Sequence, residues 1–119
     1  MSKNFVEAYK VKPQDTLTLT ITIGYAQDSS TTVKLDDIKL KENIDGSFSV
    51  PLPEKGSALI NKKLKCSTRV GAISPVTNKT SVTFKLMGGL EDSERTLEEK
   101  AEKKGQRIQY RATYKFISA

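Results

Sequence analysis

Residues 16 to 25 read Thr-Leu-Thr-Leu-Thr-Ile-Thr-Ile-Gly-Tyr, and this stretch decides the fold class. Its apolar residues occupy the odd-numbered positions from Leu17 to Tyr25, whereas threonine occupies the even-numbered positions from Thr16 to Thr22. Because successive side chains of an extended chain point to opposite faces, this alternation gives a strand one apolar side and one threonine side. The sequence therefore predicts a β-strand that is buried on one face only.

The same period of two recurs along the chain and predicts an all-β protein. We predict about seven strands, at residues 5–11, 16–25, 32–41, 48–52, 64–70, 82–86 and 108–116. Short strands with turn-rich links are typical of an antiparallel β-sandwich, and the alternative is a small β-barrel. A chain of 119 residues has the length of one domain, so we expect a single β-sandwich domain over residues 1–119.

Two of the predicted strands carry a local irregularity. In the third, the apolar positions change from odd to even numbers after Leu35, which predicts a bulge or a break at Asp36-Asp37. In the fourth, Pro51 cannot donate a hydrogen bond to a neighbouring strand. The fourth strand is therefore expected to be short and to lie at the edge of a sheet.

A charged segment at residues 91–104 interrupts the strand pattern. Glycines bracket it, at Gly88-Gly89 and at Gly105. Residues 96–99 (Thr-Leu-Glu-Glu) have the form of a capping box, and the acids precede the lysines, as suits a helix dipole. We predict a short charged helix or a mobile loop inserted between the last two strands.

Composition and cysteine content restrict the class of protein. Hydrophobic residues make up 36% of the chain and charged residues 29%, and no run reaches the roughly 20 apolar residues of a membrane helix. The first residues contain no apolar signal-peptide core, and Cys66 is the only cysteine, so no intrachain disulfide can form. We expect a soluble cytoplasmic protein with no membrane span, although a secreted protein whose signal has been removed would have the same composition.

The absence of histidine excludes several common catalytic arrangements. Without histidine the chain cannot form a Ser-His-Asp triad, a Cys-His pair or a histidine-ligated metal site. Cys66 falls on the inward face of its predicted strand, and we expect an inert buried thiol. We therefore predict that the protein is not an enzyme and needs no cofactor. The alternatives are a carboxylate-based hydrolase or a calcium site, and their candidate residues are Asp28, Asp36, Asp37, Glu42, Asp45 and Glu54.

Basic residues concentrate in the second half of the chain. Residues 61–119 hold 13 Lys or Arg against six Asp or Glu, and all six acids lie between positions 91 and 102. If the last two predicted strands form a hairpin, their outward basic side chains share one face, which would attract phosphates or other anions. The predicted anion-binding residues are Lys63, Lys65, Arg69, Lys85, Arg107, Arg111 and Lys115. The aromatic residues of these strands point inward, which disfavours a nucleic-acid site that stacks bases.

These features favour a non-catalytic binding or structural module that acts through protein–protein contact or self-association. Residues 32–40 and 48–52 are the candidate edge strands for such contact. The alternative is an anion-binding module for nucleic acid, acidic lipid or acidic glycan. The acids at 91–102 discriminate between the two functions. Folded over the basic strands, they would neutralise them and favour the structural role, whereas acids that project away would leave a basic face open.

Overall fold

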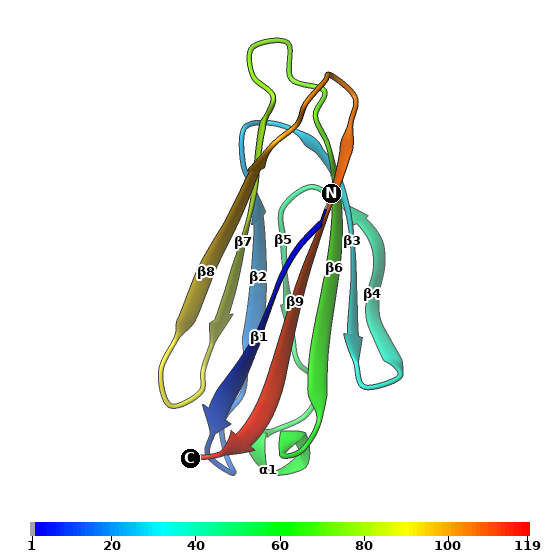
Figure 1. Ribbon diagram of the computed structural model, residues 1–119. Helices are drawn as coiled ribbons and strands as arrows, with labels where there is room; N and C mark the ends of the chain where they lie inside the picture. Colours follow the sequence, from blue (N-terminus) through cyan, green and yellow to red (C-terminus); the bar gives the residue numbers. More distant parts are fainter. Residues whose placement is uncertain (1) are drawn as a thin grey trace.

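The structure, a computed structural model, describes residues 2–119 and is a sandwich of two β-sheets (Figure 1). Its elements within these residues are β1 (Ser2–Val11), β2 (Thr18–Ile23), β3 (Asp28–Leu35), β4 (Ile38–Asp45), β5 (Phe48–Pro51), α1 (Gly56–Leu59), β6 (Lys63–Gly71), β7 (Lys79–Met87), β8 (Ser93–Lys100) and β9 (Arg107–Ser118). The larger sheet has the strand order β1-β9-β6-β3-β4, and the smaller sheet has the order β5-β2-β7-β8. Neither sheet closes on itself, so the predicted all-β sandwich is confirmed and the alternative barrel is not formed.

Strand pairing is antiparallel with one exception. Every neighbouring pair within residues 2–119 is antiparallel except β1 with β9, which run parallel. The strand β5 contains Pro51, has four residues and lies at an edge, as its sequence predicts. The strand β2 is shorter than residues 16–25, because Tyr25 lies in a turn with a φ of 60° and is exposed instead of facing inward. None of the helices in the described part of the chain is long and apolar enough to cross a bilayer.

The predicted strand at 32–41 divides into two strands. The strand β3 ends at Leu35 and β4 begins at Ile38, which confirms the predicted break at Asp36-Asp37. Asp36 adopts a φ of 50°, and its backbone N–H donates to the Lys63 carbonyl over 2.8 Å. Its carboxylate in turn accepts from the Lys63 N–H over 2.9 Å. These two bonds tie the turn to β6. The division into β3 and β4 adds one strand to the predicted seven.

The charged segment 91–104 contains the strand β8 in place of the predicted helix or loop insertion. The strand β8 pairs with β7 along its whole length. Thr96, the expected helix cap, shares a hydrogen bond with the Thr83 hydroxyl across the two strands, over 2.7 Å. Leu97 and Ala101 are four residues apart, a spacing that brings side chains to one side in a strand as well as in a helix. The helix prediction was wrong because pairing with β7 satisfies this backbone, whereas a helix of this length is marginal on its own.

One apolar core fills the space between the sheets. Its largest fully buried side chains include Tyr110, Tyr114 and Phe116 of β9 and Phe84 of β7. Phe5 on β1 contacts Phe84 and Tyr114 edge to face, with ring centroids 5.8 and 5.6 Å apart, and so links the two sheets. Such aromatic pairs contribute about 0.5–1.5 kcal/mol each beyond the burial of their area. The aromatic residues of β1, β7 and β9 therefore hold the sandwich together.

Two buried tyrosines of β9 allow a direct test of this core. The Tyr110 hydroxyl shares a hydrogen bond with the Thr80 hydroxyl, whereas the Tyr114 hydroxyl has no partner among residues 2–119. We expect Tyr110→Phe to lower the free energy of unfolding by about 1 kcal/mol. The matched variant Tyr114→Phe removes only an unpaired polar group, so stability should stay the same or rise. Urea titration of both variants measures the difference, and equal losses would contradict the assignment.

Alkaline pH should destabilise the fold through Cys66. Burial raises the pKa of this thiol, so the unfolded chain releases its proton at a lower pH than the folded chain does. The protonated thiol therefore contributes its full share of the free energy of unfolding below the unfolded thiol pKa of about 8.5. This share falls as the pH rises above that value. We expect a loss of about 1 kcal/mol between pH 8.5 and 10 in urea titrations. The variant Cys66→Ala should be less stable at neutral pH but lose less over this interval, and identical pH slopes would refute the mechanism.

Candidate anion-binding face

The outer face of the larger sheet gathers basic side chains from three adjacent strands. Inward positions of β6 and β9 are buried, so the alternate residues of both strands face outward. The register of β6 against β9 places Lys63 opposite Lys115, and the register of β3 against β6 places Lys34 opposite Lys65. We call this set the basic face, and its members are Lys34, Lys63, Lys65, Arg69, Arg107, Arg111 and Lys115.

The structure brings six of the seven predicted anion-binding residues together on the basic face. The exception is Lys85, which lies on β7 in the smaller sheet, opposite Glu94 of β8. The hairpin that would have placed Lys85 on the same face does not form, because β9 pairs with β1 and β6 while β7 pairs with β2 and β8. Alternation shows which side of a strand is buried, but it does not show to which sheet the strand belongs.

Lys34 belongs to the basic face although it was not among the predicted residues. A signal for it was present in the sequence, since Lys34 lies between the apolar residues Val33 and Leu35 and so faces outward. Residues 32–40 were a candidate edge strand, and their second part, in β4, does lie at the edge of the larger sheet. In the structure β3 lies between β6 and β4, and Lys34 has Lys65 on one side and Lys39 on the other.

Like charges face each other across the strands of the basic face. The opposed pairs are Lys63 with Lys115 and Lys34 with Lys65. Like charges directly opposite each other in a sheet are destabilising, by a few tenths to about 1 kcal/mol per pair. Among residues 2–119 the ion pairs are Lys3–Glu99, Lys39–Glu42, Lys62–Glu54 and Arg95–Glu7, and none includes a member of the basic face. The arrangement therefore costs stability, and no acid offsets it through an ion pair with a member of the basic face within residues 2–119.

The acids at 91–102 lie away from the basic face. They belong to β8 and its flanking loops, at the edge of the smaller sheet. Glu94 faces Lys85 across the strands, and Glu99 reaches Lys3 at 3.7 Å. Other acids lie at the margins of the basic face: Asp28 and Asp45 line a hollow of about 240 Å³ together with Arg69 and Arg107, and the Asp36 carboxylate accepts from the Lys63 N–H. The basic face therefore remains open along most of β6 and β9.

The arrangement suits contact with several anionic groups at once. Outward positions lie about 7 Å apart along a strand, and neighbouring strands lie about 5 Å apart. The cations share these positions with Ser67, Gln109 and Thr113. Hydroxyl and amide groups surround Arg69 in a shallow hollow of about 120 Å³ that Ser67, Gln109 and Thr32 help to line. The aromatic residues of β9 are buried on its other side. The basic face can thus contact phosphate, sulfate or carboxylate groups, but it presents no ring for stacking.

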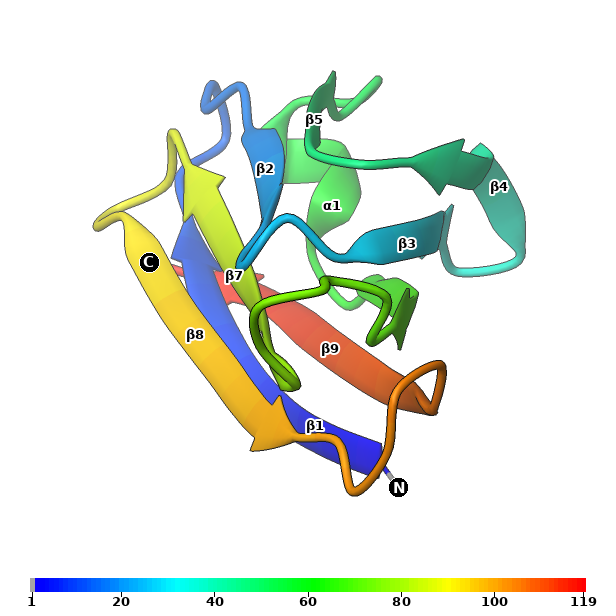
Figure 2. The same ribbon diagram turned by 90° about the horizontal axis from the view of Figure 1, so that it is seen from above.

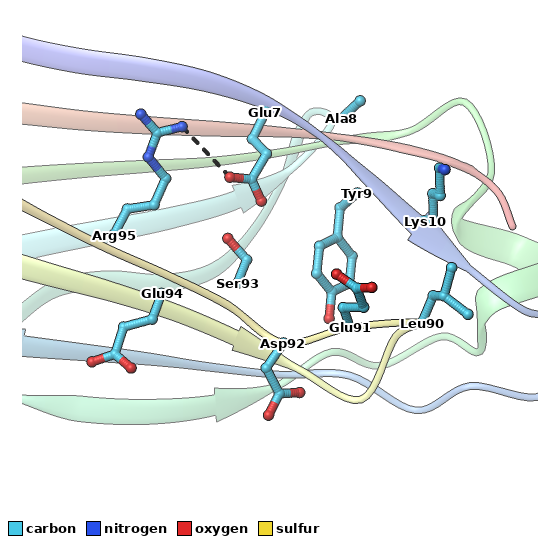
Figure 3. A pocket seen from close by; sticks show the side chains of 10 residues that line it. All are labelled: Glu7, Ala8, Tyr9, Lys10, Leu90, Glu91, Asp92, Ser93, Glu94 and Arg95. Carbon is cyan, nitrogen blue, oxygen red and sulfur yellow. Dashed lines mark ion pairs between the residues drawn. The ribbon is translucent and has the colours of Figure 1, made fainter.

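A groove of about 630 Å³ separates β1 from β8 at one side of the sandwich (Figure 3). Figure 2 shows these two strands next to each other although they belong to different sheets. Glu7 and Arg95 point toward each other across the groove and form an ion pair of 3.5 Å. The Arg95 guanidinium also lies 4.3 Å from the centre of the Phe5 ring. The role of Arg95 escaped the sequence prediction, because the segment that carries it was expected to be helical or a loop.

Several groups around this groove are engaged in structural bonds. The Tyr9 hydroxyl donates to the Leu86 carbonyl over 3.2 Å and accepts from the Gly89 N–H over 3.1 Å. The Leu90 N–H donates to the Lys10 carbonyl over 3.0 Å and so closes one end of the groove. Ser93 lies near the Tyr114 hydroxyl and slightly offsets the rise that burial causes in the Tyr114 pKa, but the two hydroxyls do not form a hydrogen bond of normal geometry. These contacts tie β1 to the segment before β8 and to β8 itself.

The candidate carboxylates for calcium or hydrolysis do not converge. Asp28 begins β3 at one end of the sandwich, whereas Asp36 and Asp37 follow β3 at the other end. Glu42 and Glu54 are paired with Lys39 and Lys62. Within residues 2–119 no group of three or more Cys, Asp or Glu side chains is placed to hold a metal ion. The candidate acids Asp28, Asp36, Asp37 and Asp45 therefore do not form one calcium site within residues 2–119.

Comparisons with protein-family models, with curated proteins and with solved structures found no match for this chain. Function must therefore be inferred from the surface itself. Of the surfaces described above, the basic face combines the strongest charge with the fewest internal partners.

Proposed function

We propose that this protein is a non-catalytic binding module that takes up polyanions on the basic face. Two cross-strand pairs of lysines carry the proposal, Lys63 with Lys115 and Lys34 with Lys65. None of these lysines forms an ion pair with an acid of residues 2–119. Folding alone gives no reason for these pairs, since opposite charges at the same positions would stabilise the sheet. A ligand with closely spaced negative charges would remove the repulsion on binding.

The chemistry of the basic face favours contacts to charged groups over recognition of bases. Lysine and arginine neutralise phosphates or sulfates and release their counterions, so affinity should fall steeply with salt. Single-stranded nucleic acids are usually held through exposed aromatic side chains as well, and the aromatic residues of β9 are buried. The partner class is therefore a polyanion recognised through its backbone or surface charge, such as an acidic glycan or a duplex nucleic acid.

Charge reversal with a matched control tests this function. Lys115→Glu should lower retention on a heparin column and reduce the salt slope of binding by about one. It should also stabilise the fold by about 0.2–1 kcal/mol, because it places opposite charges across from each other at Lys63. The control Lys85→Glu makes the same change of charge on the other sheet, next to Glu94, and should leave retention nearly unchanged. Equal losses in the two variants would assign binding to net charge and not to the basic face.

A stronger variant extends this test. Arg107→Glu combined with Arg111→Glu reverses two charges at outward positions of β9, one on either side of Gln109. We expect this double variant to elute from heparin without added salt. Retention equal to that of the unmodified protein would rule out the basic face as the binding surface.

Protein–protein contact is a second candidate, and one observation favours it. Both edge strands of the larger sheet expose a large aliphatic side chain, Val6 on β1 at 61% and Ile38 on β4 at 63%. Strand addition at these edges would join two copies of the chain. Against it, β4 has irregular pairing with β3, and the Glu7–Arg95 ion pair ties β1 to β8 of the other sheet. Natural sheets use such features to prevent edge pairing.

The oligomeric state separates the two candidates. A polyanion-binding module needs no second copy, and guarded edges oppose self-association, so we expect a monomer in light scattering over a wide range of protein concentration. A dimer that dissociates in the variant Ile38→Lys but not in Lys115→Glu would favour self-association instead. Ile38→Lys adds a charge at an exposed position and should leave the fold intact.

A further inference from the structure

The loop between β6 and β7 carries exposed aliphatic side chains at one end of the molecule. Figure 1 shows this loop, residues 72–78, at the top of the view, where it extends beyond the sheets. Val76 is 88% exposed and Ile73 is 53% exposed. Each wetted aliphatic side chain forgoes the roughly 1.5–3 kcal/mol that its burial would yield. Two such residues on one projecting loop are a feature that binding to an apolar partner would explain.

Hydrogen bonds from below hold the loop in its projecting conformation. Buried Gln27 accepts from the Ser74 N–H over 2.8 Å and donates to the carbonyls of Thr77 and Lys79 over 3.1 and 2.8 Å. The Ala72 N–H donates to the Gln106 carbonyl over 3.0 Å, which ties the loop to the segment between β8 and β9. The aliphatic side chains are thus presented on an ordered support, and binding through them loses little conformational freedom.

Lysines lie near this loop, and three of them, Lys79, Lys100 and Lys104, line one hollow with Val76. Residues 72–79 and 100–104 contain four lysines and one acid, Glu102, and Lys79 and Lys100 also line a hollow of about 280 Å³ with Glu98 and Glu99. Lys79 lies directly opposite Lys100 in the pairing of β7 with β8. Residues 74–79 also line a hollow of about 370 Å³ together with Lys100 and Lys104. As on the basic face, like charges lie opposite each other, and none of these lysines forms an ion pair within residues 2–119. We call this surface the lysine end, defined by residues 72–78 with Lys79, Lys100, Lys103 and Lys104.

We propose that the lysine end docks on a lipid bilayer that carries anionic head groups. Val76 and Ile73 would enter the boundary between head groups and acyl chains, and the lysines around them would contact the lipid phosphates and carboxylates. Lysine suits this position because its charged tip reaches the head groups while its alkyl stem lies along apolar surface. The surface potential of an anionic leaflet attracts each such lysine.

A bilayer accounts for both the exposed aliphatic side chains and the unpaired lysines of the lysine end. Other anionic partners account for the lysines alone. A nucleic acid or an acidic glycan would neutralise the lysines but leave Val76 and Ile73 in water. An apolar protein groove would cover the aliphatic side chains but would have to match four lysines as well. This inference is independent of the basic face, which lies on β3, β6 and β9, and it would stand if that face bound no ligand.

A single introduced tryptophan reports on insertion directly, because the natural chain contains none. In the full-length variant Val76→Trp we expect the fluorescence to shift to shorter wavelength with phosphatidylcholine vesicles that contain phosphatidylserine. Brominated lipids should quench this emission, and vesicles of phosphatidylcholine alone should cause no shift. Sedimentation with phosphatidylserine vesicles but without a shift would overturn the insertion of this loop. Failure to sediment with them would overturn the proposal as a whole.

Matched variants show whether binding depends on this end or on overall charge. Lys79→Gln with Lys100→Gln should weaken partitioning into phosphatidylserine vesicles about 25-fold, at about fivefold per lysine. Lys63→Gln with Lys115→Gln removes the same charge from the basic face and should change partitioning less than about twofold, since these residues lie away from the docked end. Equal losses in the two double variants would overturn the assignment to the lysine end.

The aliphatic contribution has its own control. Val76→Asp should abolish partitioning, whereas Val6→Asp places the same change at another exposed valine, on β1, and should weaken it far less. Circular dichroism spectra that match the natural protein would show that both variants fold. In the Val76→Trp variant, an emission shift with duplex DNA as large as that caused by vesicles would assign the lysine end to nucleic acid and overturn the bilayer.

Discussion

The parallel pairing of β1 with β9, beside the antiparallel pairing of β9 with β6, is the constraint on which the rest of the structure depends. It buries Phe5 of β1 against Tyr114 of β9, and Phe5 reaches Phe84 of the other sheet. Once these rings are inside, the alternate residues of β9 must face outward. A shift of one residue would turn every side chain of β9 to the opposite face and place arginines in the core. The burial of the aromatic residues therefore fixes the position of the basic residues.

The two sheets divide the charges of the second half of the chain between them. The basic residues of β6 and β9 lie on the outer face of the larger sheet, and the acids of residues 91–102 belong to β8 and its loops in the smaller sheet. This separation arises because the chain crosses from the smaller sheet to the larger sheet between β8 and β9. A hairpin of β8 with β9 would have placed Glu94 and Glu98 beside Arg107 and Arg111. The topology thus leaves cations unpaired that a simpler connection would have neutralised.

The sequence predicted those features that depend on the period of the side chains. Alternation identified the strands and the inward position of Tyr110, Tyr114 and Phe116, and it assigned six residues of the basic face to outward positions. It could not assign Lys85 to the correct sheet, because strand partners are chosen by contacts between distant segments. The same limit explains the error at β8. Leu97 and Ala101 are compatible with a helix and with a strand, and only the free edge of β7 decides between them.

The basic face and the lysine end follow one physical pattern in two places. At both, lysines lie opposite lysines in adjacent strands, as Lys63 with Lys115 and Lys79 with Lys100. The molecule measures 46 × 22 × 19 Å, and the basic face follows strands along its length while the loop at 72–78 lies at one end. A bilayer beneath that loop would leave the basic face directed sideways into solution. The two surfaces differ in their apolar content, and this difference suits them to different partners. Val76 and Ile73 add apolar contact at the lysine end, whereas β6 and β9 present charged side chains on the face of a sheet.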